Sequence, residues 1–201
     1  MNSVRRELTR DRILALSFDD GPSETLTPRL LDLLLKYDAR ATFFMLGRNA
    51  KQFPNIVDRV IREGHDVGCH SDQHLNAWKT LPWRAVNDID AGYEKLSRWI
   101  PASGMFRPPY GKMTLATYVA SRRRGASVWW WTIDSGDTHA QLPDTGYVLR
   151  EVQRQSGGIV LLHDLERSRE RDEFVFATTA ALLELARREG LKIKPLSKIC
   201  C

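Results

Sequence analysis

Cysteine is scarce in this chain, with three in 201 residues, at positions 69, 200 and 201. A disulfide framework needs more cysteines at regular spacings, so we exclude the class of small disulfide-stabilised domains. No Cys-x-x-Cys pair is present, and a zinc site built from cysteines is therefore not predicted. Cys200 and Cys201 are neighbours and poorly placed to bridge each other, and we interpret them as a frayed tail rather than a prenylation signal.

Long apolar stretches are also missing. Nothing approaches the ~18 consecutive apolar residues of a membrane-spanning helix, so no membrane span is predicted. Residues 1–12 are polar and charged and lack the apolar core of a secretory signal. If the chain is complete we expect a cytoplasmic location, and if it is cut from a longer protein we expect export.

The chain has no low-complexity segment and no strong charge imbalance. Its net charge is +5, and its 42% hydrophobic and 27% charged residues are typical of an ordinary globular protein. The one tight basic run, residues 122–124, precedes Gly125, where a helix is expected to end and where cations are favoured. We therefore predict no nucleic-acid partner. The length fits a single domain over residues 1–201 with a sizeable core.

Apolar segments alternate with helical patterns along the chain. Strands are expected at 13–18, 41–46, 65–70, 105–106, 127–133, 159–162 and 191–193. Helices are expected from Thr27-Pro28 to Asp38, from Pro54 to Gly64, and at 83–100, 115–124, 147–155 and 174–189. Buried strands separated by helices predict a parallel sheet of the α/β class. A compact, distorted (β/α) barrel is favoured, with an open doubly wound sheet as the alternative.

Chemically useful side chains stand where the expected strands end. These strand ends carry Asp19-Asp20, His70, Arg107, Asp134 and His163. In parallel α/β folds the functional residues gather at the carboxyl ends of strands, so this coincidence favours an enzyme. The alternative interpretation of Asp-Asp-Gly-Pro alone is a solvated turn.

Two histidines, His70 and His74, are four residues apart, which on a helical turn puts both on one face. Together with Asp20 they form a nitrogen and oxygen donor set suited to zinc or a similar divalent ion. Three protein ligands leave coordination positions for water and substrate, as in catalytic sites. Adjacent residues at a strand end project to different sides, so one of the two carboxylates of Asp19-Asp20 could hold a metal ion while the other handles a proton.

Arg107 and His163 extend this candidate site. The Arg107 guanidinium could hold a carboxylate through paired hydrogen bonds, although Arg-Pro-Pro-Tyr-Gly also makes a rigid turn whatever the function. His163 ends a buried strand and is a candidate acid because an imidazole titrates near neutrality.

Five ordered motifs resemble those of the polysaccharide deacetylase family, the NodB-homology domain of carbohydrate esterase family 4. They lie at residues 18–22, 70–74, 107–111, 131–137 and 161–163, and read FDDGP, HSDQH, RPPYG, WTIDSGD and LLH. The resemblance implies a distorted (β/α)7–8 barrel whose motif-bearing core covers about residues 13–195. It also implies a metal-dependent hydrolase.

The resemblance assigns a role to each matching residue. Asp20, His70 and His74 match the metal ligands, usually of zinc and sometimes of cobalt or another divalent ion. Asp19 matches the catalytic base, Arg107 the arginine that holds it, His163 the catalytic acid, and Asp134 the carboxylate that orients this acid. The substrate-binding positions are Tyr110, whose backbone N–H helps bind the oxyanion, Leu161, which lines the acetyl pocket, and Pro108; Ser71 is expected to steady the histidine loop.

Two residues depart from the family pattern. Thr138 stands where the fourth motif commonly has Trp, so the wall of the acetyl pocket is expected to differ. Cys69 stands where the family often has Asn, and we expect it to pack in its strand rather than to compete for the metal.

The implied reaction is removal of N-acetyl groups from an acetylated amino-sugar glycan of chitooligosaccharide or peptidoglycan type, with release of acetate. Open alternatives are O-deacetylation of a glycan such as acetylated xylan, hydrolysis of another non-peptide C–N bond, and a catalytically silent glycan-binding domain. The expected partner is the glycan, and a monomer is favoured.

Overall fold

The computed structural model describes residues 2–199, so Cys200 and Cys201 lie outside the described residues. Its centre is a six-stranded sheet in the order β3-β2-β1-β5-β4, with β6 beside β1 and every pairing parallel. Strand bounds are β1 Ile13–Asp19, β2 Thr42–Met45, β3 Asp66–Cys69, β4 Ile133–Asp134, β5 Gly158–His163 and β6 Lys192–Ile193. β1 is central and all seven of its residues are buried, as its apolar sequence predicts.

Single-residue bridges extend the sheet into a ring. Phe106 bridges Cys69 of β3 on one side and Val128 on the other. The segment 127–135 then passes from Phe106 to β5, where the N–H groups of Thr132 and Ser135 donate to carbonyl oxygens of β5. The two edges of the sheet are thereby joined. The α/β class and the distorted barrel are confirmed, and the open doubly wound sheet is wrong.

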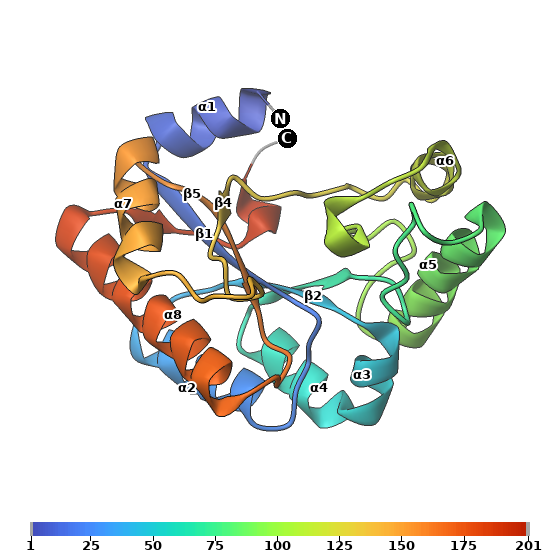
Figure 1. Ribbon diagram of the computed structural model, residues 1–201, viewed down its shortest axis with the longest axis horizontal. Helices are drawn as coiled ribbons and strands as arrows, with labels where there is room; N and C mark the ends of the chain where they lie inside the picture. Colours follow the sequence, from blue (N-terminus) through green and yellow to red (C-terminus); the bar gives the residue numbers. More distant parts are fainter. Residues whose placement is uncertain (1, 200–201) are drawn as a thin grey trace.

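Helices surround this ring in Figure 1. Their bounds are α1 Asn2–Arg10, α2 Leu26–Lys36, α3 Gly47–Gln52, α4 Pro54–Arg62, α5 Pro82–Leu96, α6 Leu115–Arg123, α7 Thr145–Gln155 and α8 Arg169–Glu189, with short 3-10 turns at η1 Pro109–Gly111 and η2 Leu196–Lys198. No helix within residues 2–199 is long and apolar enough to cross a membrane.

Alternation along β1 divides the core into two parts. Leu14, Leu16 and Phe18 belong to the larger cluster, between the sheet and the surrounding helices. Ile13 and Ala15 belong to a smaller cluster inside the ring, which α1 covers through Leu8 and η2 through Leu196. The same alternation turns Ser17 and Asp19 toward the interior, at the end of the ring away from α1.

Several elements differ from the sequence prediction. α1 and α3 were not predicted, because α1 carries its core-facing pair, Val4 and Leu8, in an otherwise polar segment, and α3 is a six-residue helix of mainly polar residues. α8 begins at Arg169 rather than at residue 174, since the Ser168 side chain caps a polar first turn by accepting from the Arg171 N–H. The strand predicted at 127–133 is regular only at Ile133–Asp134, because this segment changes pairing partner along its length.

Candidate active site

Two adjacent carboxylates, Asp19 and Asp20, stand at the carboxyl end of the central strand and are 2% and 3% exposed. The turn that follows packs tightly on the end of β5. A Cβ on Gly21 would clash with the carboxylate group of Asp164, which favours glycine at this position. Burial raises the pKa of Asp164 to about 7 despite the hydrogen bond that the Thr27 hydroxyl donates to it. Sequence reasoning did not single out Asp164.

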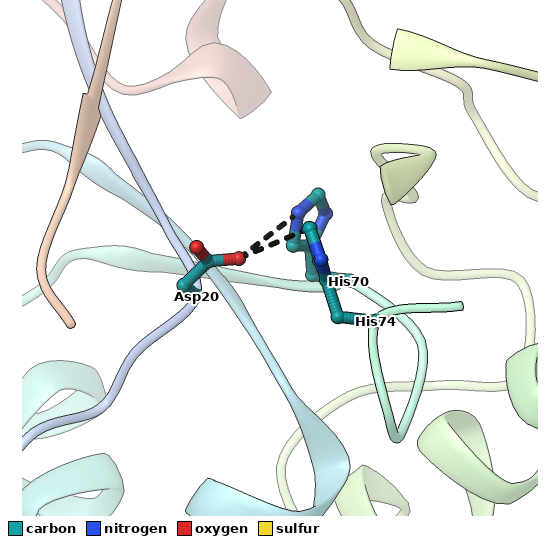
Figure 2. A group of neighbouring side chains, drawn as sticks. All are labelled: Asp20, His70 and His74. Atoms are coloured by element: carbon teal, nitrogen blue, oxygen red, sulfur yellow. Dashed lines mark ion pairs between the residues drawn. The ribbon is translucent and has the colours of Figure 1, made fainter. Parts of the chain in front are cut away.

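Asp20, His70 and His74 converge on one point, as Figure 2 shows. Oδ1 of Asp20 lies 3.2 Å from Nε2 of His74 and 3.5 Å from Nε2 of His70. Two ligand atoms about 2.05 Å from a tetrahedral zinc ion would lie ~3.3 Å apart, so these separations suit a shared ion. Oδ1 of Asp20 is buried and has no hydrogen-bond donor among the described residues. A divalent cation fits this donor set and would satisfy that oxygen.

Both imidazoles present a free nitrogen to this point. Nδ1 of His70 lies 2.7 Å from the carbonyl oxygen of Arg107, so it carries the proton and Nε2 keeps its lone pair for a metal. Burial, and then repulsion between the protonated forms of His70 and His74, lower the pKa of His74 to about 4, so its imidazole is neutral at physiological pH. Burial opposes ionisation of Asp20, but its electrostatic interactions with the His70 and His74 imidazoles, and then with His163 and Arg167, outweigh it and lower the pKa of that carboxyl.

The loop that carries the histidines is not helical, contrary to the geometry predicted for their spacing. Ser71 and His74 have φ angles of 66° and 61°, in the left-handed region that L residues rarely adopt. The Ser71 hydroxyl accepts the His74 N–H at 3.1 Å. The Asp88 carboxylate, from α5, accepts the N–H groups of Gln73 at 2.7 Å and Leu75 at 3.1 Å. Asp88 thus fastens the residues on both sides of His74, a contact between segments that no local pattern signals.

Arg107 is fully buried and holds Asp19. Its Nη1 donates to Oδ1 of Asp19 and to the Ser17 hydroxyl, both at 2.8 Å, and its guanidinium stacks 4.2 Å from the Phe44 ring. Burial lowers the pKa of Arg107, although the Asp19 charge opposes this. Oδ2 of Asp19 lies 3.7 Å from Nε2 of His70, so this carboxylate borders the metal position.

The carboxylate beside His163 is Asp137, and the prediction that Asp134 orients this histidine is wrong. Oδ1 of Asp137 lies 2.9 Å from Nδ1 of His163, and Oδ2 accepts the His163 N–H at 2.7 Å. Asp134 instead accepts the N–H of Gly136. Gly136, with a φ of 73°, turns the chain back after β4 and brings Asp137 to the end of β5.

The surroundings of His163 favour its protonated form. Burial alone would lower the pKa, but the hydrogen bond and charge of Asp137, followed by the charges of Asp19 and Asp20, outweigh it and raise the pKa to about 9. A protonated imidazole in this position can donate a proton to a leaving group.

Comparison with known proteins identifies the family. The polysaccharide deacetylase family model matches residues 6–140. The chain is 35% identical over 193 residues to a peptidoglycan-N-acetylglucosamine deacetylase of Bacillus cereus, covering 94% of this chain and 88% of that one. The chain belongs to the polysaccharide deacetylase family. A chitooligosaccharide deacetylase of Bradyrhizobium sp. is 30% identical and matches 98% of this chain and 96% of its own length.

A solved structure agrees with this assignment. The crystal structure of a peptidoglycan N-acetylglucosamine deacetylase superimposes with a TM-score of 0.82 and 28% identity, covering 95% of this chain and 89% of that one. The resemblance inferred from the five motifs is therefore confirmed.

The deacetylase has one cavity that joins the groups described above. Its volume is about 440 Å³, and its lining includes Asp19, Asp20, His70, His74, Asp134 and His163 together with Tyr110, Thr138 and Leu161. Tyr110 is 54% exposed, and its ring centroid lies 4.5 Å from that of His74. Leu161 contributes an apolar side chain to the cavity wall and Thr138 contributes a hydroxyl group. The position where this chain has Thr in place of the family's usual Trp therefore lies in the cavity wall.

Pro108 is not in this cavity, and its prediction as a substrate-binding residue is wrong. It is buried and lines a separate, much smaller cavity with Ser71 and Phe106. Its backbone is extended, whereas Tyr110 has a φ of 58° and turns toward the site. Cys69 lies in the core, where burial raises the pKa of its thiol to about 12, and it is not in the cluster of possible metal ligands.

Arg167 completes the site of the deacetylase, and no motif or spacing in the sequence marked it as a site residue. It comes from the loop between β5 and α8, lines the cavity, and donates from Nη2 to Oδ2 of Asp20 at 2.9 Å. Arg171 fixes the same loop by donating to the carbonyl oxygens of Asp137 and His139. One oxygen of Asp20 is thus held by Arg167 while the other faces the imidazoles.

Proposed function

We propose that this protein removes N-acetyl groups from an acetylated amino-sugar glycan of peptidoglycan or chitooligosaccharide type and releases acetate. The observation that carries the proposal is the orphaned Oδ1 of Asp20 between two imidazole nitrogens, with Asp19 and His163 in the same cavity. The names of the relatives point to the same substrate class. We propose that one domain, residues 1–201, carries the whole activity as a monomer.

Asp20, His70 and His74 would hold one divalent ion, and zinc suits their oxygen and nitrogen donors, with cobalt as a substitute. When bound, such an ion lowers the pKa of a water molecule and polarises the acetyl carbonyl. The residues around it then divide the remaining work.

Asp19 accepts the proton of the attacking water, because it borders the metal position and Arg107 fixes its other oxygen. The backbone N–H of Tyr110 stabilises the negative charge that develops on the acetyl oxygen, and one such donor typically contributes about 3 kcal/mol. His163 donates a proton to the departing amine, which would be a poor leaving group as an anion. Leu161 and Thr138 border the acetyl group.

The test is acetate release from N-acetylglucosamine oligomers, peptidoglycan and acetylated xylan, with added zinc or cobalt and with a chelator as control. We expect release from the N-acetylated glycans and its loss on chelation. Release from acetylated xylan alone would support the O-deacetylase alternative, in which Thr138 reshapes the acetyl wall. Binding of glycan without any turnover would mark a catalytically silent domain, and full activity in the chelated sample would refute the metal scheme.

A further inference from the structure

An exposed aromatic side chain that has no role in the proposed reaction lies beside the cavity. Trp78, in the loop that follows the metal-binding histidines, is 66% exposed. Its indole is nevertheless fixed, because Nε1 donates to the carbonyl oxygen of Met113 at 3.0 Å. A single exposed apolar side chain is common on protein surfaces, so what distinguishes Trp78 is the fixed orientation of its indole and the residues that neighbour it.

Lys112 connects this indole to the active site. Its side chain lines the cavity, and its ammonium lies 4.8 Å from the centroid of the Trp78 ring. The motif that carries Tyr110 therefore continues directly into the residues that hold Trp78: Lys112 contacts one side of the ring, and Met113 accepts its N–H. The indole and the ammonium together make a surface that begins at the cavity rim.

This surface suits a sugar ring. A hexosamine presents apolar C–H groups on its faces and hydroxyl and amide groups around its edge. An indole matches the first and a lysine ammonium can donate to the second. A glycan whose acetamido group occupies a cavity of about 440 Å³ must continue over the rim with its neighbouring rings.

We propose that Trp78 and Lys112 bind a second N-acetylhexosamine ring of the same glycan chain, adjacent to the ring that is deacetylated. This inference rests on the proposed function and adds to it a preference for oligomers over short fragments. Trp83 provides a matched control. It is a comparably exposed tryptophan, 61%, but it lines a groove between α5 and α6 that does not include the metal-site residues.

The experiment compares wild-type protein, Trp78→Ala and Trp83→Ala on N-acetylglucosamine oligomers from dimer to hexamer, all loaded with zinc. For wild-type protein we expect kcat/KM to rise with oligomer length. Trp78→Ala should lose about tenfold on the hexamer and less than about twofold on the dimer, since roughly 60 Å² of buried apolar surface is enough for a tenfold effect. Trp83→Ala should follow wild-type protein at every length.

A second measurement does not depend on turnover. Calorimetric binding of the hexamer to metal-free protein should weaken about tenfold in Trp78→Ala and remain unchanged in Trp83→Ala. An equal loss on dimer and hexamer, or a loss of zinc affinity, would show that Trp78 only supports its loop and would overturn the inference. Acetate release without any dependence on length or on Trp78 would overturn it while leaving the proposed function intact. Failure of the wild-type protein to release acetate would instead overturn the proposed function. The binding measurement still tests the inference in that event: equal affinity of wild-type protein and Trp78→Ala for the hexamer would overturn it.

Discussion

Replacing Asp137 by Asn should move the alkaline limit of the deacetylase reaction to lower pH. The amide keeps an oxygen that can accept from Nδ1 of His163, but it loses the hydrogen bond that Oδ2 accepts from the His163 N–H and removes the charge that stabilises the protonated imidazole. Raising the pKa of His163 from 6.5 to about 9 corresponds to about 3 kcal/mol in favour of the protonated form. We assign about 2 kcal/mol to the charge of Asp137, because the hydrogen bond to His163 and the charges of Asp19 and Asp20 supply the other favourable contributions, and burial opposes all of them. The pKa of His163 should then fall to roughly 7.5.

The sign follows from the role of His163 as an acid. Activity is retained while the imidazole is protonated and is lost as the pH rises through its pKa, so the variant should lose activity earlier than wild-type protein. At pH 8.5 the protonated fraction would fall about eightfold between the two pKa values. Because both proteins would carry the same ion, its charge cancels in the difference between the two pKa values, and this difference is the quantity that the pH profiles measure.

The assay is kcat for acetate release between pH 6 and 10, with Asp134→Asn as the matched control. Asp134 lies three residues away in the same segment and lines the same cavity, but its carboxylate accepts from Gly136. We expect its alkaline limb to stay with that of wild-type protein. An alkaline limb that moves in Asp134→Asn and not in Asp137→Asn would refute the reasoning and restore the assignment made from sequence.

Three further predictions concern the residues around the metal position. Asp20→Ala and His74→Ala should each abolish zinc binding and turnover, measured by calorimetry and acetate release; a variant that keeps either property would contradict the ligand set. Asp88→Ala should weaken zinc affinity about 10- to 100-fold by freeing the loop around His74. Asp90→Ala is the control: it removes a charge from the same helix and breaks a surface ion pair with Arg124, and it should leave zinc affinity unchanged. Equal losses of zinc affinity in the Asp88 and Asp90 variants would refute the positioning role of Asp88. Arg107→Met should cost about 3–5 kcal/mol in the free energy of unfolding in urea, because it leaves the Asp19 carboxylate buried and unpaired; a loss below about 1 kcal/mol would contradict this.

The sequence predicted those features that depend on local pattern. The apolar run that ends in Asp19 and Asp20 indicates a buried central strand, and strand ends in a parallel sheet meet at one rim. From this rule alone His70 and His163 are expected near the same point, and the structure places them there. The resemblance to the family's motifs also predicted one contact between distant segments, that of Arg107 with Asp19.

What the sequence could not provide depends on backbone turns and on contacts between segments. Asp134 and Asp137 are three residues apart in one motif, and only the turn at Gly136 decides which of them meets His163. The four-residue spacing of His70 and His74 suggests a helical turn, whereas left-handed residues place them in a loop. The contribution of Asp88 comes from a separate helix, so no periodicity in its own segment marks it.

The most direct test of the metal site is a crystal structure of the protein soaked with zinc, recorded with anomalous data at the zinc edge. We expect one ion about 2.0–2.2 Å from a carboxylate oxygen of Asp20 and from Nε2 of His70 and His74, with an open position facing Asp19. An ion bound elsewhere, or an ion that lacks any one of these three ligands, would contradict it.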